Sequence, residues 1–164
     1  MSAADEATIT SQLGRPPRGV VGVAWRCAGG EPGVVVTEPR LPDGTPFPTL
    51  YYLTCPKLVS AVSTLEANQV MVDMTARLES DPDLARSYRD AHLAYLADRA
   101  ELGSVPEIKG ISAGGMPNRV KCLHVLVGHA LAAGPGVNPL GDEAVALLTA
   151  AGVRCLAGRA ETRD

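Results

Sequence analysis

Aromatic side chains, long apolar runs and a surplus of basic residues are all scarce or absent in this chain of 164 residues. Aromatic residues make up only 4% of the sequence, and the formal net charge is −3 at pH 7. No stretch approaches the roughly 20 apolar residues that a membrane span needs, so we expect no association with a membrane. The lack of an overall basic balance also argues against general nucleic-acid binding.

Cysteine is sparse as well, with four residues at unrelated spacings. Four are too few for the disulfide scaffold of a small secreted domain, and the polar, acidic N-terminus does not resemble a secretory signal. We therefore expect a cytoplasmic protein with reduced thiols. With 46% hydrophobic residues, the chain can nevertheless bury a core as one globular domain.

The apolar pattern changes along the chain from a period of two to a period near four. Runs at 20–26 and 33–37 are β-branched and predict a hairpin, with the first strand buried. After a proline-rich loop at 38–48, residues 49–54 predict a third strand. Helical patterns follow from Pro56 onward. Strands first and helices later indicate an α+β fold, in which four to five helices, one of them central and buried, cover a small antiparallel sheet from the N-terminal third.

Three parts are expected along the chain. Residues 1–18 form a polar segment with a short helix, residues 19–156 form a single α+β domain, and residues 157–164 form a polar tail. A helix that Pro117 opens and that runs to Ala133 carries apolar residues on nearly every side. Such a pattern is typical of a buried helix, so we expect this one at the centre.

Five runs between residues 20 and 148 are specific enough to compare with known families. They are RC at 26–27 with Gly33 nearby, DGTPFPTLYYLTCP at 43–56, LEA at 65–67, GMPNRVKCLH at 115–124 with the residues to His129, and NPLGD at 138–142. In these runs the chain resembles a bacterial family, DUF501, a domain of unknown function. The resemblance implies a common fold for residues 19–156 and implies no activity.

Cys55 is expected where a strand stops and a helix begins, beside the positive end of the helix dipole, which favours a thiolate. This position makes it a candidate metal ligand or nucleophile, and a buried structural cysteine is the alternative. Thiolate and imidazole are the usual ligands of zinc. Cys27, Cys55 and Cys122, completed by His129 or alternatively by His124, therefore form a hypothetical zinc site.

The predicted helix from Pro117 limits that hypothesis. At about 100° per residue, Cys122 and His124 point to opposite sides of the helix, and Cys122 and His129 are about 10.5 Å apart along its axis. No pair matches the i, i+4 spacing of helical metal motifs, and the sequence contains no CxxC motif. A metal site would take one ligand from this helix and the others elsewhere. The alternative is that both histidines are hydrogen-bonded core residues.

The loop before the same helix suggests a second kind of site. Gly114 and Gly115 would lie at the helix N-terminus, with Arg119 and Lys121 in its first turns. Free N–H groups, the dipole and two cations suit a phosphate or carboxylate, so we expect a small anionic ligand there. The spacing is neither that of a P-loop nor that of a dinucleotide-binding motif. A solvated loop with ordinary capping is the alternative.

The sequence names no reaction, and whether the protein is an enzyme stays open. Cys55 and His124 are the candidates for any chemistry, whereas Cys155, near the end of the chain, is expected to have no role. Three functions remain: a cysteine- and histidine-centred site that binds zinc, binding or turnover of a phosphate-bearing ligand, and a non-catalytic interaction protein whose motifs serve the fold.

Overall fold

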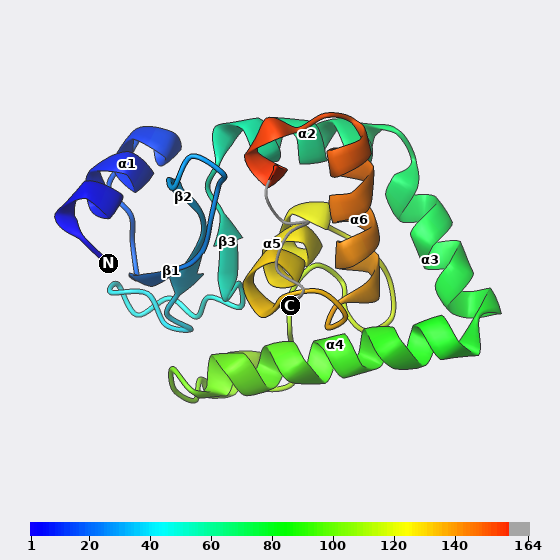
Figure 1. Ribbon diagram of the computed structural model, residues 1–164. Coiled ribbons are helices and arrows are strands. Elements are labelled where there is room, and N and C mark those ends of the chain that lie inside the picture. The colour runs from blue at the N-terminus through cyan, green and yellow to red at the C-terminus, as the bar shows by residue number, and fades with distance from the viewer. Residues whose placement is uncertain (158–164) are drawn as a thin grey trace, which may run out of the picture.

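The computed structural model describes residues 1–157, so the predicted tail at 157–164 lies, apart from its first residue, outside the described residues (Figure 1). Three strands form one antiparallel sheet near the N-terminus, and six α-helices lie in the described part of the chain. The predicted α+β class is confirmed. None of the described helices combines the length and the apolar character needed to cross a membrane.

The sheet follows chain order, with β1 (Val20–Arg26), β2 (Pro32–Thr37) and β3 (Tyr51–Leu53) side by side. β2 is the middle strand, and five of its six residues are buried. The expectation that residues 20–26 form a buried strand is wrong, because most of β1 is half exposed. As an edge strand, β1 has a hydrogen-bonded neighbour on one side only.

The helices begin and end at residues that the local chemistry favours. Gly14 ends the first helix with a φ of 67°, and Pro56 and Pro82 stand at the first positions of two others, where the missing N–H costs no hydrogen bond. The helices are α1 (Ala3–Leu13), α2 (Pro56–Ala67), α3 (Val70–Ser80), α4 (Pro82–Ala100), α5 (Leu123–Ala133) and α6 (Pro139–Ala150), with short 3-10 turns η1 (Pro106–Ile108) and η2 (Arg154–Leu156).

α5 is the central helix, as Figure 1 shows, and it packs against β3, α2 and α6. Two glycines allow this close packing. A Cβ atom at Gly128 would lie 2.9 Å from the carbonyl oxygen of Tyr51 in β3, and a Cβ atom at Gly141 in α6 would lie 2.4 Å from the carbonyl oxygen of Leu126. The backbones of β3, α5 and α6 therefore approach one another more closely than larger residues would permit.

The predicted start of the central helix at Pro117 is wrong. α5 begins at Leu123, and the residues before it fold back as a loop in which the N–H of Lys121 donates to the carbonyl of Gly114 at 2.7 Å. Gly114 and Gly115 have φ values of 69° and 95°, which turn the chain away from a helical path. Cys122 is consequently the residue before the helix, with an extended backbone, rather than part of it.

Candidate functional site

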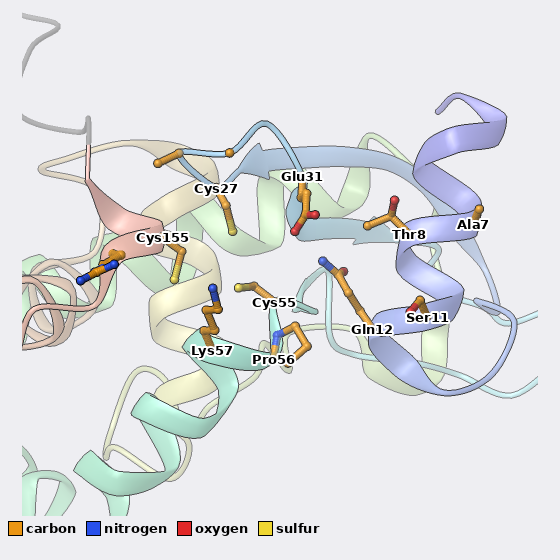
Figure 2. Close-up of a pocket in the computed structure, with 13 residues that line it drawn as sticks. Ala7, Thr8, Ser11, Gln12, Cys27, Glu31, Cys55, Pro56, Lys57 and Cys155 are labelled. Atoms are coloured by element: carbon orange, nitrogen blue, oxygen red, sulfur yellow. The ribbon is translucent and has the colours of Figure 1, made fainter.

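Three of the four cysteines converge at one place. The sulfur atoms of Cys27, Cys55 and Cys155, here called the cysteine cluster, lie within 4.8 Å of one another (Figure 2). Cys27 follows β1, Cys55 immediately precedes α2, and Cys155 lies in η2. All are free thiols. Segments far apart in the sequence therefore bring three sulfur atoms together.

Main-chain hydrogen bonds hold these segments in place. The N–H of Ala28 donates to the carbonyl of Cys155 at 3.1 Å, which joins η2 to the turn after β1. The N–H of Cys55 donates to the carbonyl of Gly33 at 3.4 Å. A Cβ atom at Gly33 would lie 2.5 Å from the ring of Trp25, so any larger residue at this junction would require the ring to move. The backbone thus places the cysteines, and the side chain of Cys55 makes no capping hydrogen bond to α2.

Cys27 and Cys155 favour protonated thiols when no cation is present. Burial, followed by the neighbouring thiol of Cys55, raises the pKa of Cys27 to about 12, and burial also raises the pKa of Cys155. A metal ion among the three sulfur atoms would reverse this balance, because a coordinating thiol loses its proton. The cluster is therefore an arrangement that a thiophilic cation would stabilise.

The cysteine cluster opens into a pocket of about 830 Å³. Charged residues of both signs line it, namely Glu31, Lys57 and Arg154, and none of these takes part in an ion pair within the described part of the chain. α1 contributes polar side chains to the opposite wall, among them Gln12. In Figure 2, Lys57 lies beside the sulfur atoms, and Glu31 and Gln12 lie farther along the pocket. The sulfur atoms thus face a space with both apolar and charged lining, large enough for a small molecule.

Cys122 lies elsewhere, with Glu66 and His124, in a group whose potential ligand atoms also lie within 4.8 Å of one another. We call this group the cap cluster. The Oε1 atom of Glu66 accepts a hydrogen bond from the N–H of Leu123 at 2.7 Å and lies 3.1 Å from Nδ1 of His124. Glu66 therefore closes the N-terminus of α5 with a carboxylate from α2, where negative charge suits the helix dipole.

His124, a candidate for catalysis, is held between hydrogen-bond acceptors. Its Nδ1 atom faces Glu66 and its Nε2 atom lies 3.1 Å from the carbonyl oxygen of Val59. A carboxylate and a carbonyl can only accept, so both ring nitrogens carry protons. The hydrogen bond with Cys122, together with Glu66 and Val59 and against the effect of burial, raises the pKa of His124 to about 9. At neutral pH it is a cation and not a general base.

His129, the predicted fourth zinc ligand, is fully buried in the core. Its ring stacks on Tyr51 and meets Tyr95 edge-on, and its Nδ1 atom accepts a hydrogen bond from the side-chain amide of Asn138 at 3.2 Å. Burial lowers the pKa of His129 to about 4, so the ring is neutral. His129 is therefore a core histidine that is hydrogen-bonded through Nδ1, while its buried Nε2 atom has no hydrogen-bond partner among the described residues.

The structure does not bring the four hypothetical zinc ligands together. Cys27 and Cys55 share the cysteine cluster, Cys122 belongs to the cap cluster, and His129 lies among aromatic rings. The physical reason is the later start of α5, which leaves Cys122 facing α2. Sequence reasoning missed Cys155, because no neighbouring residue marks it and its partners lie far away in the sequence.

The four residues of the predicted anion site do line one hollow, of about 390 Å³. They are not at a helix N-terminus, since α5 begins at Leu123 and its first N–H already donates to Glu66. The N–H groups of Arg119 and Lys121 donate to the carbonyls of Gly115 and Gly114. These two donors are therefore not free for a ligand, and anion binding there stays a prediction.

The profile of one family, described as "Protein of unknown function (DUF501)", matches residues 23–146, which is most of the chain. The matched range contains Cys27, Cys55 and the whole cap cluster, and it ends before Cys155. The resemblance expected from the sequence motifs is confirmed. No curated protein and no solved structure matches the chain.

Proposed function

We propose, from the geometry of the site, that this protein binds a metal ion. The chain belongs to the DUF501 family, whose function is unknown, so the family gives no guide to the ligand. The ion is Zn²⁺, and the thiolates of Cys27, Cys55 and Cys155 hold it. The observation that carries this proposal is the mutual approach, within 4.8 Å, of three sulfur atoms from three separate segments. Core packing alone does not require buried cysteines to gather in this way.

The donor set suits zinc. Thiolates are among its usual ligands, and tetrahedral coordination with Zn–S bonds of about 2.3 Å places sulfur atoms roughly 3.8 Å apart. The cysteine cluster therefore needs a contraction of no more than about 1 Å to reach that geometry. Three protein ligands leave the fourth position open, as in zinc sites that bind water or a substrate. Iron–sulfur clusters are mostly held by four cysteines, so three favour a mononuclear ion.

Metal analysis of the full chain, purified under reducing conditions, tests the proposal. We expect one zinc ion per chain, lost in Cys27→Ser, Cys55→Ser and Cys155→Ser and retained in Cys122→Ser. Loading with Co²⁺ should produce a thiolate-to-cobalt charge-transfer absorption in the unmodified protein, which keeps the test decisive if a variant fails to fold. Absence of both bound zinc and this absorption would overturn the proposal.

A further inference from the structure

The fourth coordination position of the proposed zinc ion would face the 830 Å³ pocket. The side chains that line this pocket indicate which class of ligand occupies that position. We infer that the ligand is a small zwitterionic aminothiol, a molecule that carries a thiol, a carboxylate and an ammonium group, and that its sulfur completes the metal coordination. This inference rests on the proposed zinc site and extends it to the ligand class.

The fourth donor comes from outside the described chain. Only the three cysteines lie within ligand distance of one another at this site. Glu31 lines the pocket and lies outside this ligand group. Within residues 1–157, no other side chain stands ready to complete a tetrahedron.

The metal site prefers sulfur as its fourth donor. Three thiolates give a zinc complex a net charge of −1, which weakens the attraction of the ion for hard oxygen donors. Soft sulfur donors are the better partners of a metal that is already bound by thiolates. A fourth thiolate would bring the complex to −2, and two cations in the same pocket, Lys57 and Arg154, compensate for that charge.

The pocket offers a partner to each charged group of the ligand. Arg154 immediately precedes Cys155 and Lys57 lies two residues after Cys55, and neither has an ion-pair partner in the described chain. They suit a carboxylate next to the metal-bound sulfur. Glu31 offers a carboxylate to an ammonium group.

Gln12 supplies an independent observation. Its amide nitrogen donates to the carbonyl of Pro32 at 2.8 Å, whereas its Oε1 atom is buried and has no hydrogen-bond partner among the described residues. A buried acceptor without a donor is costly, so Gln12 would gain from a rearrangement that turns Oε1 toward an N–H donor in the pocket that its side chain lines. The volume lies within the range of small-molecule sites, about 300 to 1,000 Å³.

The test uses the Co²⁺-loaded full chain titrated with L-cysteine. We expect a saturable increase and shift of the charge-transfer absorption as a fourth sulfur joins the metal, with cobalt still bound after gel filtration. L-serine has a hydroxyl in place of the thiol and should leave the spectrum unchanged. Cysteamine lacks the carboxylate and 3-mercaptopropionate lacks the ammonium group, so each should bind more weakly than cysteine.

Two variants separate the roles of the charges. Lys57→Gln should weaken cysteine binding at least about threefold, and should weaken cysteamine binding less, because cysteamine brings the thiolate but not the carboxylate. Glu31→Gln should weaken cysteine binding and leave 3-mercaptopropionate binding unchanged. Both variants should retain their cobalt.

The outcomes distinguish this inference from the proposed function. A protein that binds cobalt with three sulfur ligands and ignores every thiol would overturn the inference and leave the zinc site intact. The same conclusion follows if L-serine changes the absorption spectrum as much as L-cysteine does, or if L-cysteine removes the cobalt from the protein. A protein that binds no metal would overturn both.

Discussion

Two groups of side chains in this protein contain thiols, and they are built in opposite ways. In the cysteine cluster, main-chain hydrogen bonds set the positions and the sulfur atoms lie against one another beside an open pocket. In the cap cluster, Glu66 and His124 use their polar atoms to tie α2 to the start of α5. A carboxylate that caps a helix can bind a metal only at a cost to the fold. Proximity of potential ligand atoms is therefore not enough to identify a metal site. The hydrogen bonds that those atoms already make decide whether the group binds a metal or stabilises the fold.

The largest effect should come from removing the metal from the cysteine cluster. A chelator should lower the free energy of unfolding by at least about 4 kcal/mol, because an ion present at 1,000 times its dissociation constant stabilises the folded state by that amount. Chemical denaturation followed by circular dichroism measures the change. Cys155→Ser should lose the same stability and should no longer respond to the chelator. If the chelator leaves the unfolding free energy of the unmodified protein unchanged, both clusters serve the fold and neither binds a metal.

Glu66→Ala in the cap cluster should have the next largest effect. It removes the acceptor for the N–H of Leu123 and the partner of the His124 cation, so we expect a loss of about 2 to 3 kcal/mol in unfolding free energy. Glu66→Gln keeps an acceptor oxygen and loses the charge, and about half of that loss is expected. Both variants should keep one zinc ion per chain. Release of zinc by Glu66→Ala would show that the two clusters are not independent.

The cap cluster should also make stability depend on pH. The pKa of His124 is about 9 in the folded protein, above its ordinary value of 6.5, so its stabilisation is complete below pH 6.5 and is lost as the pH rises toward 9. We expect about 2 kcal/mol, since each unit of pKa corresponds to about 1.4 kcal/mol and the ring is partly exposed. Urea unfolding across this window measures the change, and His124→Gln should flatten it.

His129 does not interfere with that measurement. Its folded pKa of about 4 lies below the ordinary value of 6.5, so its contribution falls only as the pH drops from 6.5 toward 4. The two histidines thus act in separate windows and in opposite directions. A slope above pH 6.5 that survives in His124→Gln would assign the effect to another group.

Much of the fold could be predicted because its signals are local. A period of two changes to a period near four at Pro56, and prolines and glycines mark the ends of helices. The start of α5 was not predictable in this way. Pro117 suits the first turn of a helix, yet the hydrogen bond from Lys121 to Gly114 closes a loop there instead. Pairing between residues seven positions apart overrode the local preference.

The candidate site was predictable only where position along the chain determines environment. Cys55 lies between the end of a strand and the start of a helix, and the residues on either side of it predict both elements. Cys155 and Glu66 act on groups that are distant in the sequence, so nothing beside them reveals a role. The sequence therefore identified two members of the cysteine cluster, Cys27 and Cys55, and missed the third, Cys155.

The smallest expected effect gives the sharpest comparison between the clusters, because Cys122→Ser and Cys155→Ser are the same change of sulfur to oxygen. Cys122 is partly exposed and precedes α5 without capping it, and its sulfur lies 3.9 Å from Nδ1 of His124. Serine is a favourable residue at that position, so unfolding free energy should change by less than about 1 kcal/mol, with zinc retained. The hydrogen bond with Cys122 is the largest cause of the raised pKa of His124, so NMR titration should find that pKa lowered in Cys122→Ser. If Cys122→Ser instead releases zinc as Cys155→Ser does, hydrogen bonding does not separate a ligand from a cap in this protein.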